Sequence, residues 1–288
     1  MVGDLGPSLS EAAPYIQSFR DQFVVIKLGG ELFDQGSTLE RIVPQVATLY
    51  RCGLRPVLVH GGGKQIDERC AKEAVAIEKR HGRRITSPAV LEIVLEVVGG
   101  DINGRFCQLL EEAGVPTHGF AAGVAEAIHC RRRPPVEIEG EQVDFGEVGD
   151  VLEVHTETLV RDSDGGKVPV FPSIGMGENG PLNVNADSIA SKIAVALRAQ
   201  KLVMLSRVAG VMEDLNADGP ISQLTTVEAR ELIDEGIVEG GMRAKLEEAL
   251  SALTGAVAEV HVISGVQPQT LLREIFTDEG CGTWIRRA

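Results

Sequence analysis

The sequence predicts an α/β protein in which helices cover a central, mainly parallel β-sheet. Short runs of β-branched residues alternate along the chain with longer segments of helical periodicity, a pattern typical of parallel sheets. Two of the expected strands run directly into glycines, at Gly29-Gly30 and at Gly61-Gly62-Gly63. Because open α/β sheets bind ligands at the C-terminal ends of their strands, these glycines indicate a binding site.

The first expected element is a helix over residues 9–20. Leu9-Ser10-Glu11 supplies a capping serine and an acidic first turn, and apolar residues follow up to Ile16. An amphipathic helix that lies outside the first strand must bury its apolar face either on its own domain or on another subunit. The composition leaves both options open.

Five strands and six further helices are expected, each from its own pattern. The strands are short apolar runs rich in valine and isoleucine, over Phe23–Leu28, Pro56–His60, Val168–Phe171, Lys201–Leu205 and Glu259–Ile263. The helices have longer apolar periods and lie over Leu39–Arg51, Lys64–Glu78, Ala89–Glu112, Ser188–Arg198, Thr226–Glu235 and Met242–Thr254.

The stretch from Val124 to Val154 interrupts this alternation. Its short apolar pieces begin at Ala127, Val136 and Val143 and are separated by Pro134-Pro135 and by glycines. Such punctuation predicts antiparallel β-hairpins inserted into the α/β body.

Composition excludes several classes of protein. At 288 residues, 43% of them hydrophobic, the chain can form one large domain or two lobes. A net charge of -14 argues against a nucleic-acid surface, and Arg131-Arg132-Arg133 is interpreted as part of a loop. The five cysteines form no C-x-x-C pair, and no stretch reaches the ~18 apolar residues of a membrane span. We therefore expect a soluble, cytoplasmic protein.

Two lysines beside glycines indicate a phosphate site. Lys27 ends an apolar strand just before Gly29-Gly30, and Lys245 follows Gly240-Gly241 at the start of a helix, in what we expect to be its first turn. Bare backbone N–H groups and ammonium groups together are suited to bind phosphate. The alternatives are a lysine at a sheet edge for Lys27 and a solvated helical lysine for Lys245.

The segment from Asn183 to Asp187 has polar residues at alternate positions, Asn183, Asn185 and Asp187. If the segment is extended, the three side chains share one face and could orient a ligand and the lysines. The alternative is that Asp187 is only the N-cap of the helix that follows.

A carboxylate on the substrate would need a clamp, for which Arg84 is the candidate and Arg83 the competitor. His60 is more simply interpreted as a hydrogen-bonded histidine at a strand end than as a base. The histidines show no metal-binding spacing, so any metal is expected to be Mg²⁺ carried by a nucleotide.

Six short motifs in order and spacing resemble those of the N-acetylglutamate kinases, a branch of the amino acid kinase family. They are Lys27-Leu-Gly-Gly, His60-Gly-Gly-Gly, Gly82-Arg-Arg84-Ile-Thr, Asn183-Val-Asn-Ala-Asp187, Gly240-Gly-Met-Arg-Ala-Lys245 and Phe276-Thr-Asp-Glu-Gly-Cys-Gly-Thr283. The resemblance implies a three-layer αβα sandwich with a β-hairpin insert. It also implies an oligomerisation helix over residues 1–20, an N-terminal lobe over 21–175 for the acyl acceptor and dimerisation, and a C-terminal lobe over 176–288 for ATP.

The resemblance further implies phosphorylation of the side-chain carboxylate of N-acetyl-L-glutamate, with ATP and Mg²⁺, in arginine biosynthesis. The implied catalytic residues are Lys27, Asp187 and Lys245. The implied acceptor-binding residues are Gly61, Gly62, Gly63, Arg84, Asn183 and Asn185. The implied ATP-binding residues are Gly29, Gly30, Ser206, Arg207, Gly210, Gly240, Gly241 and Met242.

The N-terminal helix resembles the one that links dimers into hexamers in the arginine-inhibited branch of these kinases. That likeness implies a homo-oligomer, dimer or hexamer, with arginine feedback through Tyr15 and Glu279 and a possible nitrogen-regulatory partner protein. The chain departs from the family at Glu31, at Ser206-Arg207 where an aspartate is usual, and at Gln269 where a histidine is frequent.

Three other functions compete with this interpretation. One is a related kinase acting on an aminoadipyl-type carboxylate, or a kinase-like module allied to the acetylglutamate synthases. Another is a catalytically weak arginine sensor. Retention of Lys27, Asp187 and Lys245 argues against the sensor. The third, a nicotinamide-binding protein, is disfavoured because no G-x-G-x-x-G follows the first strand.

Overall fold

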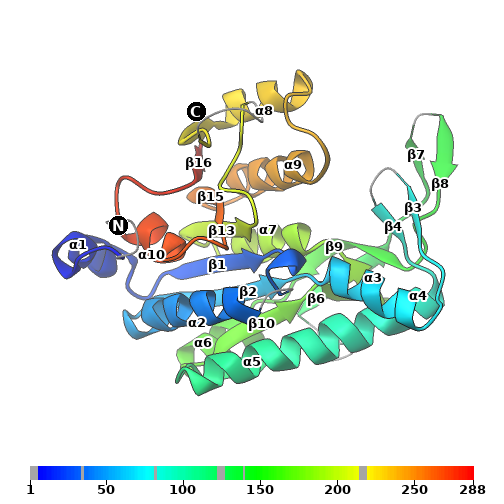
Figure 1. The fold of residues 1–288 in the computed structure, drawn as a ribbon, viewed down its shortest axis with the longest axis horizontal. Coiled ribbons are helices and arrows are strands. Elements are labelled where there is room, and N and C mark those ends of the chain that lie inside the picture. Colours follow the sequence, from blue (N-terminus) through cyan, green and yellow to red (C-terminus); the bar gives the residue numbers. More distant parts are fainter. Residues whose placement is uncertain (1–5, 34–35, 81–82, 122–126, 139, 214–218) are drawn as a thin grey trace.

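The computed structural model describes residues 6–33, 36–80, 83–121, 127–138, 140–213 and 219–288. Within them an eight-stranded sheet forms the centre of the molecule (Figure 1). Its spatial order is β14 (Gln223–Thr225), β16 (Thr283–Arg286), β15 (Glu259–Ser264), β13 (Lys201–Ser206), β1 (Phe23–Leu28), β2 (Arg55–His60), β10 (Val168–Pro172) and β5 (Thr117–Gly119). Only β15 and β16 pair antiparallel, so the expected mainly parallel sheet is confirmed.

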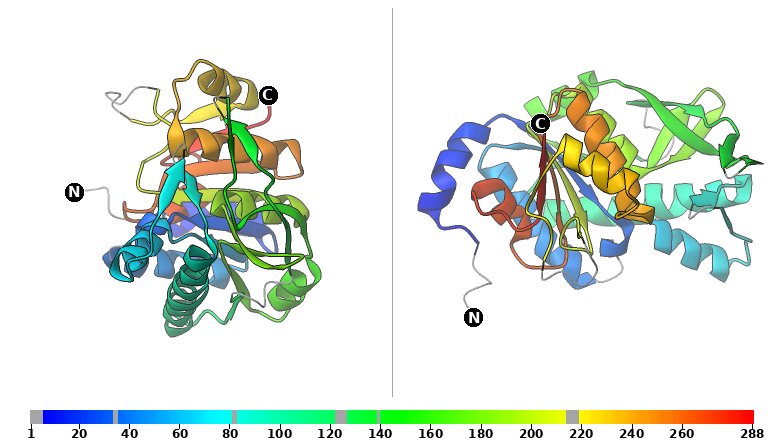
Figure 2. Two further views of the ribbon diagram at one scale, coloured as in Figure 1. Left: turned by 90° about the vertical axis from the view of Figure 1, so that its right-hand side faces the viewer. Right: turned by 90° about the horizontal axis from the view of Figure 1, so that it is seen from above.

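Helices form a layer on each face of this sheet, which confirms the three-layer sandwich (Figures 1 and 2). One layer contains α6 (Glu157–Asp164), α7 (Ala186–Ala196), α8 (Thr226–Asp234) and α9 (Gly240–Thr254). The other contains α1 (Leu9–Phe19), α2 (Gly36–Arg51), α5 (Asn103–Glu112) and α10 (Thr270–Phe276). The expected strands and helices thus all exist, and most of their bounds differ by a few residues.

Strand β1 shows how the layers are specified. Its side chains alternate between faces, so Val25 packs among the residues of the α7 layer and Val24 and Ile26 among those of the α2 layer. Lys27 lies on the same face as Val25 and is buried. An ammonium group in that position requires a partner, because burying an unpaired charge is costly.

A long helical segment runs beneath the sheet, from α4 (Pro88–Val94) through a π-helical stretch, η2 (Leu95–Ile102), into α5. Ser87 caps its start. The expected helix over Ala89–Glu112 is therefore confirmed, with a wider middle. The helix expected over Lys64–Glu78 is shorter, since α3 (Gly63–Lys72) ends before Ala74, which has a positive φ.

The N-terminal helix α1 begins at Leu9, but its cap lies two residues before the expected Ser10. The Ser8 hydroxyl, not that of Ser10, accepts from the backbone N–H of Glu11, and the Glu11 carboxylate accepts from the backbone N–H of Ser8. This reciprocal capping box stabilises the first turn. Figure 1 shows α1 at one end of the molecule, where it packs on α10.

Hairpins project from the opposite end of the sheet. The pair β7 (Val136–Ile138) and β8 (Glu141–Val143) stands beside the pair β3 (Glu78–Arg80) and β4 (Arg83–Ile85) in Figures 1 and 2. The first pair confirms the expected insert, whose residues 124–126 and 139 lie outside those described. The second pair was not predicted, because the helix before it was expected to continue to Glu78, where β3 begins.

A small closed barrel supports the hairpins. It consists of β6 (Ile128–Arg132), β9 (Val148–Val154), β11 (Ile174–Gly177) and β12 (Gly180–Val184). Its strands come from two separate parts of the chain, and the barrel is not among the elements expected from the sequence. No helix among the described residues is both long and apolar enough to cross a bilayer.

Candidate active site

Two glycine turns meet where β1 and β2 end. A Cβ added to Gly30 would lie 2.9 Å from the backbone nitrogens of Gly62 and Gly63. A Cβ on Gly62 would lie 2.7 Å from the Ile102 side chain and 2.8 Å from that of Val98. Only glycines permit this approach, so the two turns lie side by side as the sequence predicts.

A buried carboxylate joins two lysines above these turns. Asp187 Oδ1 lies 2.9 Å from Lys27 Nζ and 3.3 Å from Lys245 Nζ. The three side chains come from β1, α7 and α9, and each is at most 12% exposed. The structure therefore brings together all three residues expected to be catalytic, and the solvated-lysine interpretation of Lys245 is wrong.

Charge pairing controls the ionisation of this cluster. Burial opposes the charged form of Asp187, but Lys27 and Lys245 outweigh it and lower the pKa of the carboxyl to about 2. Burial also opposes the charge of Lys27, but Asp187 raises the pKa of that lysine. Burial and the repulsion of Lys27 lower the pKa of Lys245. An incoming anion would thus stabilise both ammonium groups.

The helix starts around the cluster differ from those expected. Asn185 is the N-cap of α7, and its Oδ1 accepts from the backbone N–H of Asp187 at 2.8 Å. The backbone is extended only as far as Asn185, so Asp187 is neither the cap nor the third residue of an extended face. Since α9 begins at Gly240, Lys245 lies in its second turn and not its first.

Beside the cluster is a cavity of about 260 Å³ lined by Arg84 and Asn183. Arg84 Nη2 donates to Gly63 O and to Asp67 Oδ1, both at 2.6 Å, and its side chain is 11% exposed. Its Nε is buried and has no hydrogen-bond partner among the described residues. Asn183 Nδ2 donates to Thr86 Oγ1 at 3.0 Å. This arrangement offers guanidinium and amide donors to a small anionic molecule.

Arg133 also lines this cavity and was not predicted. Its Nε and Nη2 both donate to Asp150 Oδ1, at 2.9 and 2.6 Å. The only sequence signal was the basic run Arg131–Arg133, which was interpreted as a loop. Arg83 lines the cavity too, but it is exposed, whereas Arg84 is held by two acceptors. Of the two guanidinium groups, that of Arg84 is the one held in place beside the cavity.

His60 has the structural role preferred from its sequence context. It is fully buried, and its Nε2 accepts from Asn103 Nδ2 at 3.0 Å. Burial lowers the pKa of His60 to about 4. The imidazole is therefore neutral near pH 7.

The residues expected to bind a nucleotide have several positions. Gly240 and Gly241 open α9, Ser206 ends β13, and Arg207 beyond it is exposed. Gly210 instead packs closely, because a Cβ there would lie 2.6 Å from Thr283 Oγ1. Met242 packs partly buried against the core. Both positions remain predicted nucleotide-binding residues.

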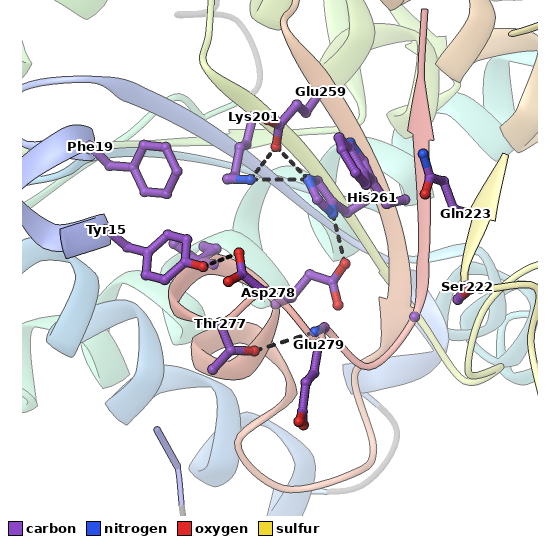
Figure 3. A pocket seen from close by; sticks show the side chains of 15 residues that line it. Tyr15, Phe19, Lys201, Ser222, Gln223, Glu259, His261, Thr277, Asp278 and Glu279 are labelled. Carbon is purple, nitrogen blue, oxygen red and sulfur yellow. Dashed lines mark hydrogen bonds and ion pairs between the residues drawn. The ribbon is translucent and has the colours of Figure 1, made fainter. Parts of the chain in front are cut away.

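A second cavity, of about 320 Å³, lies at the N-terminal ends of β13 and β15 (Figure 3). Tyr15 and Glu279, the two residues expected to form a regulatory site, both line it. The Tyr15 hydroxyl donates to Asp278, which raises the pKa of Tyr15 to about 12. In Figure 3 the Glu279 side chain points away from Lys201 and His261.

The wall of this second cavity is an unpredicted charge network. Lys201 pairs with Glu259, and the two ring nitrogens of His261 lie 3.2 Å from Glu259 Oε2 and 2.7 Å from Glu274 Oε1. Burial opposes the charge of Glu259, but His261 and Lys201 lower its pKa to about 2. The cavity is therefore built from fixed charges of both signs.

Residues 22–264 match the model of the amino acid kinase family. The chain is 38% identical to the acetylglutamate kinase of Methanothrix thermoacetophila, over 96% of each chain. It is 40% identical to that of Symbiobacterium thermophilum, over 98% of this chain and 97% of the relative.

A solved structure is also similar. The N-acetylglutamate synthase of Neisseria gonorrhoeae in complex with coenzyme A and N-acetyl-glutamate has a TM-score of 0.85 at 28% identity. Its complex with coenzyme A and L-arginine has a TM-score of 0.79 at the same identity. The alignments cover 97% of this chain but only 63% and 65% of the synthase chain, respectively.

Proposed function

Because the chain belongs to the amino acid kinase family and, within it, to the acetylglutamate kinases, we propose that it phosphorylates N-acetyl-L-glutamate. The γ-phosphoryl group of ATP is transferred to the side-chain carboxylate, giving N-acetylglutamyl 5-phosphate for arginine biosynthesis. The observation that carries this proposal is the buried cluster of Lys27, Asp187 and Lys245 beside the glycine turns.

The proposed mechanism is positioning combined with charge neutralisation. The acceptor carboxylate is ionised at neutral pH, so no base has to remove a proton, which agrees with the neutral, buried His60. Lys27 and Lys245 would stabilise the negative charge on the oxygens of the transferring group, and Asp187 would hold both ammonium groups in place. ATP would carry Mg²⁺ into the site.

The acceptor is proposed to occupy the cavity lined by Arg84 and Asn183. The α-carboxylate would pair with the Arg84 guanidinium, and the side-chain carboxylate would reach the N-terminus of α3 at Gly62 and Gly63. The size of the cavity and the three arginines in its wall support this orientation, although Glu247 and Glu248 also line it. The lobes proposed from the resemblance, residues 21–175 and 176–288, would then both line the acceptor cavity, through Arg84 and Asn183 respectively, and the second would also bind ATP.

The reaction is tested by incubating the protein with ATP, Mg²⁺ and N-acetylglutamate and trapping the acyl phosphate with hydroxylamine. Hydroxamate formation above a control without acceptor is expected. A 2-aminoadipate derivative serves as the competing acceptor, and hydroxamate from it alone would contradict the proposed substrate. No hydroxamate from either acceptor would contradict the kinase.

Arg84→Lys is expected to raise KM for N-acetylglutamate by about 10- to 100-fold with a smaller change in kcat. A lysine cannot hold Gly63 O and Asp67 and also present a planar pair of donors to a carboxylate. Arg83→Lys is the matched control, because Arg83 lines the same cavity but is exposed. An equal rise of KM in both variants would contradict the assignment of the clamp to Arg84.

We also propose that arginine inhibits the enzyme through the second cavity and that α1 links dimers into a hexamer. Asp278 and Glu279 line the cavity and suit a guanidinium. The position of α1 at one end of the molecule and the 79% exposure of Leu9 support a contact with another subunit. The nitrogen-regulatory partner and the cytoplasmic location remain predictions.

Removal of residues 1–20 is expected to lower the mass in solution from that of a hexamer to that of a dimer and to abolish inhibition by arginine. The truncation deletes the subunit link and also Tyr15 and Phe19 from the cavity. Light scattering and the hydroxamate assay measure the two effects. Tyr15→Phe is the control, which should keep the mass of the hexamer and weaken only the inhibition by arginine. If the truncated protein kept the mass of the hexamer, the proposed link through α1 would be refuted.

A further inference from the structure

The carboxylate of Glu31 lies in the space that the glycines after β1 leave open. The short helix η1 (Gly30–Phe33) begins directly after Gly29, and Glu31 is its second residue. A Cβ added to Gly29 would lie 2.5 Å from both the carboxyl carbon and Oε2 of Glu31. The side chain thus folds back over the backbone of Gly29 and covers it.

This position also places Glu31 over the end of β1 that carries Lys27, since Gly29 follows Lys27 by two residues. Its charge acts on both Lys27 and Lys245, favouring their ammonium forms. Asp187 alone leaves one net positive charge on the three groups, and the Glu31 carboxylate compensates for it. The Glu31 carboxylate is therefore an anion placed over the glycine backbone of this site.

A carboxylate resembles a phosphate in the features that this site recognises. Both are anionic hydrogen-bond acceptors of similar oxygen spacing, and both suit an ammonium pair and an uncovered glycine backbone. We propose that Glu31 is a built-in competitor for the nucleotide phosphates, which must displace its side chain before they can reach Lys27 and Lys245. This inference rests on the proposed function only in taking the displacing anion to be part of ATP.

The proposal gives Glu31 a definite effect on affinity. The Glu31 carboxylate and a nucleotide phosphate would repel each other strongly if both occupied the space over Gly29. Part of the binding energy of the phosphates is therefore used to move the Glu31 side chain away. Affinity for the polyphosphate portion should be lower than the lysines alone would allow. Affinity for the nucleoside portion should not depend on Glu31.

The test compares the wild type with Glu31→Gln, which keeps the size of the side chain and removes its charge. Binding of inorganic pyrophosphate is measured by calorimetry at low ionic strength, first without magnesium and then with it. Glu31→Gln is expected to raise the affinity about tenfold without magnesium, a gain that shrinks as salt screens the charges. Glu40→Gln is the control, since Glu40 is exposed on the nearby helix α2, and its affinity should match the wild type.

Other results would overturn the proposal. Equal affinity of Glu31→Gln and the wild type for pyrophosphate would mean that Glu31 does not occupy the phosphate position. Absence of pyrophosphate binding to both proteins would mean that this site is not a phosphate site. Weaker binding by the variant only when magnesium is present would identify Glu31 as a metal ligand instead.

The same samples are assayed for hydroxamate, so the two proposals can fail separately. An inactive wild type whose pyrophosphate affinity still rises in Glu31→Gln would contradict the kinase and leave the competitor intact. An active wild type whose pyrophosphate affinity equals that of Glu31→Gln would support the kinase and contradict the role of Glu31 as a competitor.

Discussion

Replacing Lys245 with alanine is expected to lower kcat about 100- to 1,000-fold, the usual effect of removing one group that stabilises charge in a transition state. The ammonium of Lys245 is buried 3.3 Å from Asp187 and belongs to the cluster that would face the transferring phosphoryl group. The fold should survive, because Asp187 keeps its shorter contact with Lys27. Hydroxamate formation at saturating substrates measures the loss.

The control for this prediction is a lysine of the neighbouring helix. Lys192 lies on α7 and is exposed, so Lys192→Ala should keep kcat close to that of the wild type. Far-ultraviolet circular dichroism of Lys245→Ala should match the wild-type spectrum. Undiminished turnover in a folded Lys245→Ala protein would remove Lys245 from the mechanism.

The central strands were predictable because they are buried on both faces. Strand β1 has the predicted bounds, and β2 and β13 each gain one residue. Parallel strands covered on both sides appear as nearly continuous apolar runs, which neighbouring segments do not imitate. The strand ends were equally clear, since glycines follow both β1 and β2.

The edge strands and the barrel could not be predicted in this way. The edge strands β5 and β14 have three residues each, too few to show a period. The barrel strands pair across long separations, as β12 does with β9 at Asn183 and Val148. Nothing local in either strand specifies the other.

The site was predictable in its residue types and less so in its contacts. Lys27, Asp187 and Lys245 all come from recognisable motifs, yet only the packing of α7 and α9 on β1 shows that one oxygen of Asp187 joins both lysines. Glu31 was noted as a departure from the family, but its place above Gly29 depends on how η1 turns back over the strand end. The direction of a side chain after a glycine turn is not encoded in a local pattern.

Asp187→Asn is expected to inactivate the enzyme and to destabilise it by about 3–5 kcal/mol at pH 7, because two buried ammonium groups lose their shared carboxylate. The pKa of Asp187 falls from its ordinary 3.8 to about 2 on folding. A carboxyl with a lowered pKa stabilises the fold fully above its unfolded pKa, and that contribution is lost as the pH falls through the folded pKa. The wild type should therefore lose it between about pH 4 and pH 2.

Denaturant unfolding at pH 7, 4 and 3 measures this difference between the wild type and Asp187→Asn. The difference in the free energy of unfolding should be largest at pH 7 and should decrease as the pH is lowered, because a protonated Asp187 and an asparagine are both neutral. Asp164→Asn removes a 57% exposed carboxylate that pairs with Arg55 at 2.7 Å, and its effect should stay below about 1 kcal/mol. If the loss of stability in Asp187→Asn did not change with pH, it would come from the shape of the amide and not from the lost charge. Charge pairing of Asp187 with the two lysines would then not be what holds α7 and α9 on β1.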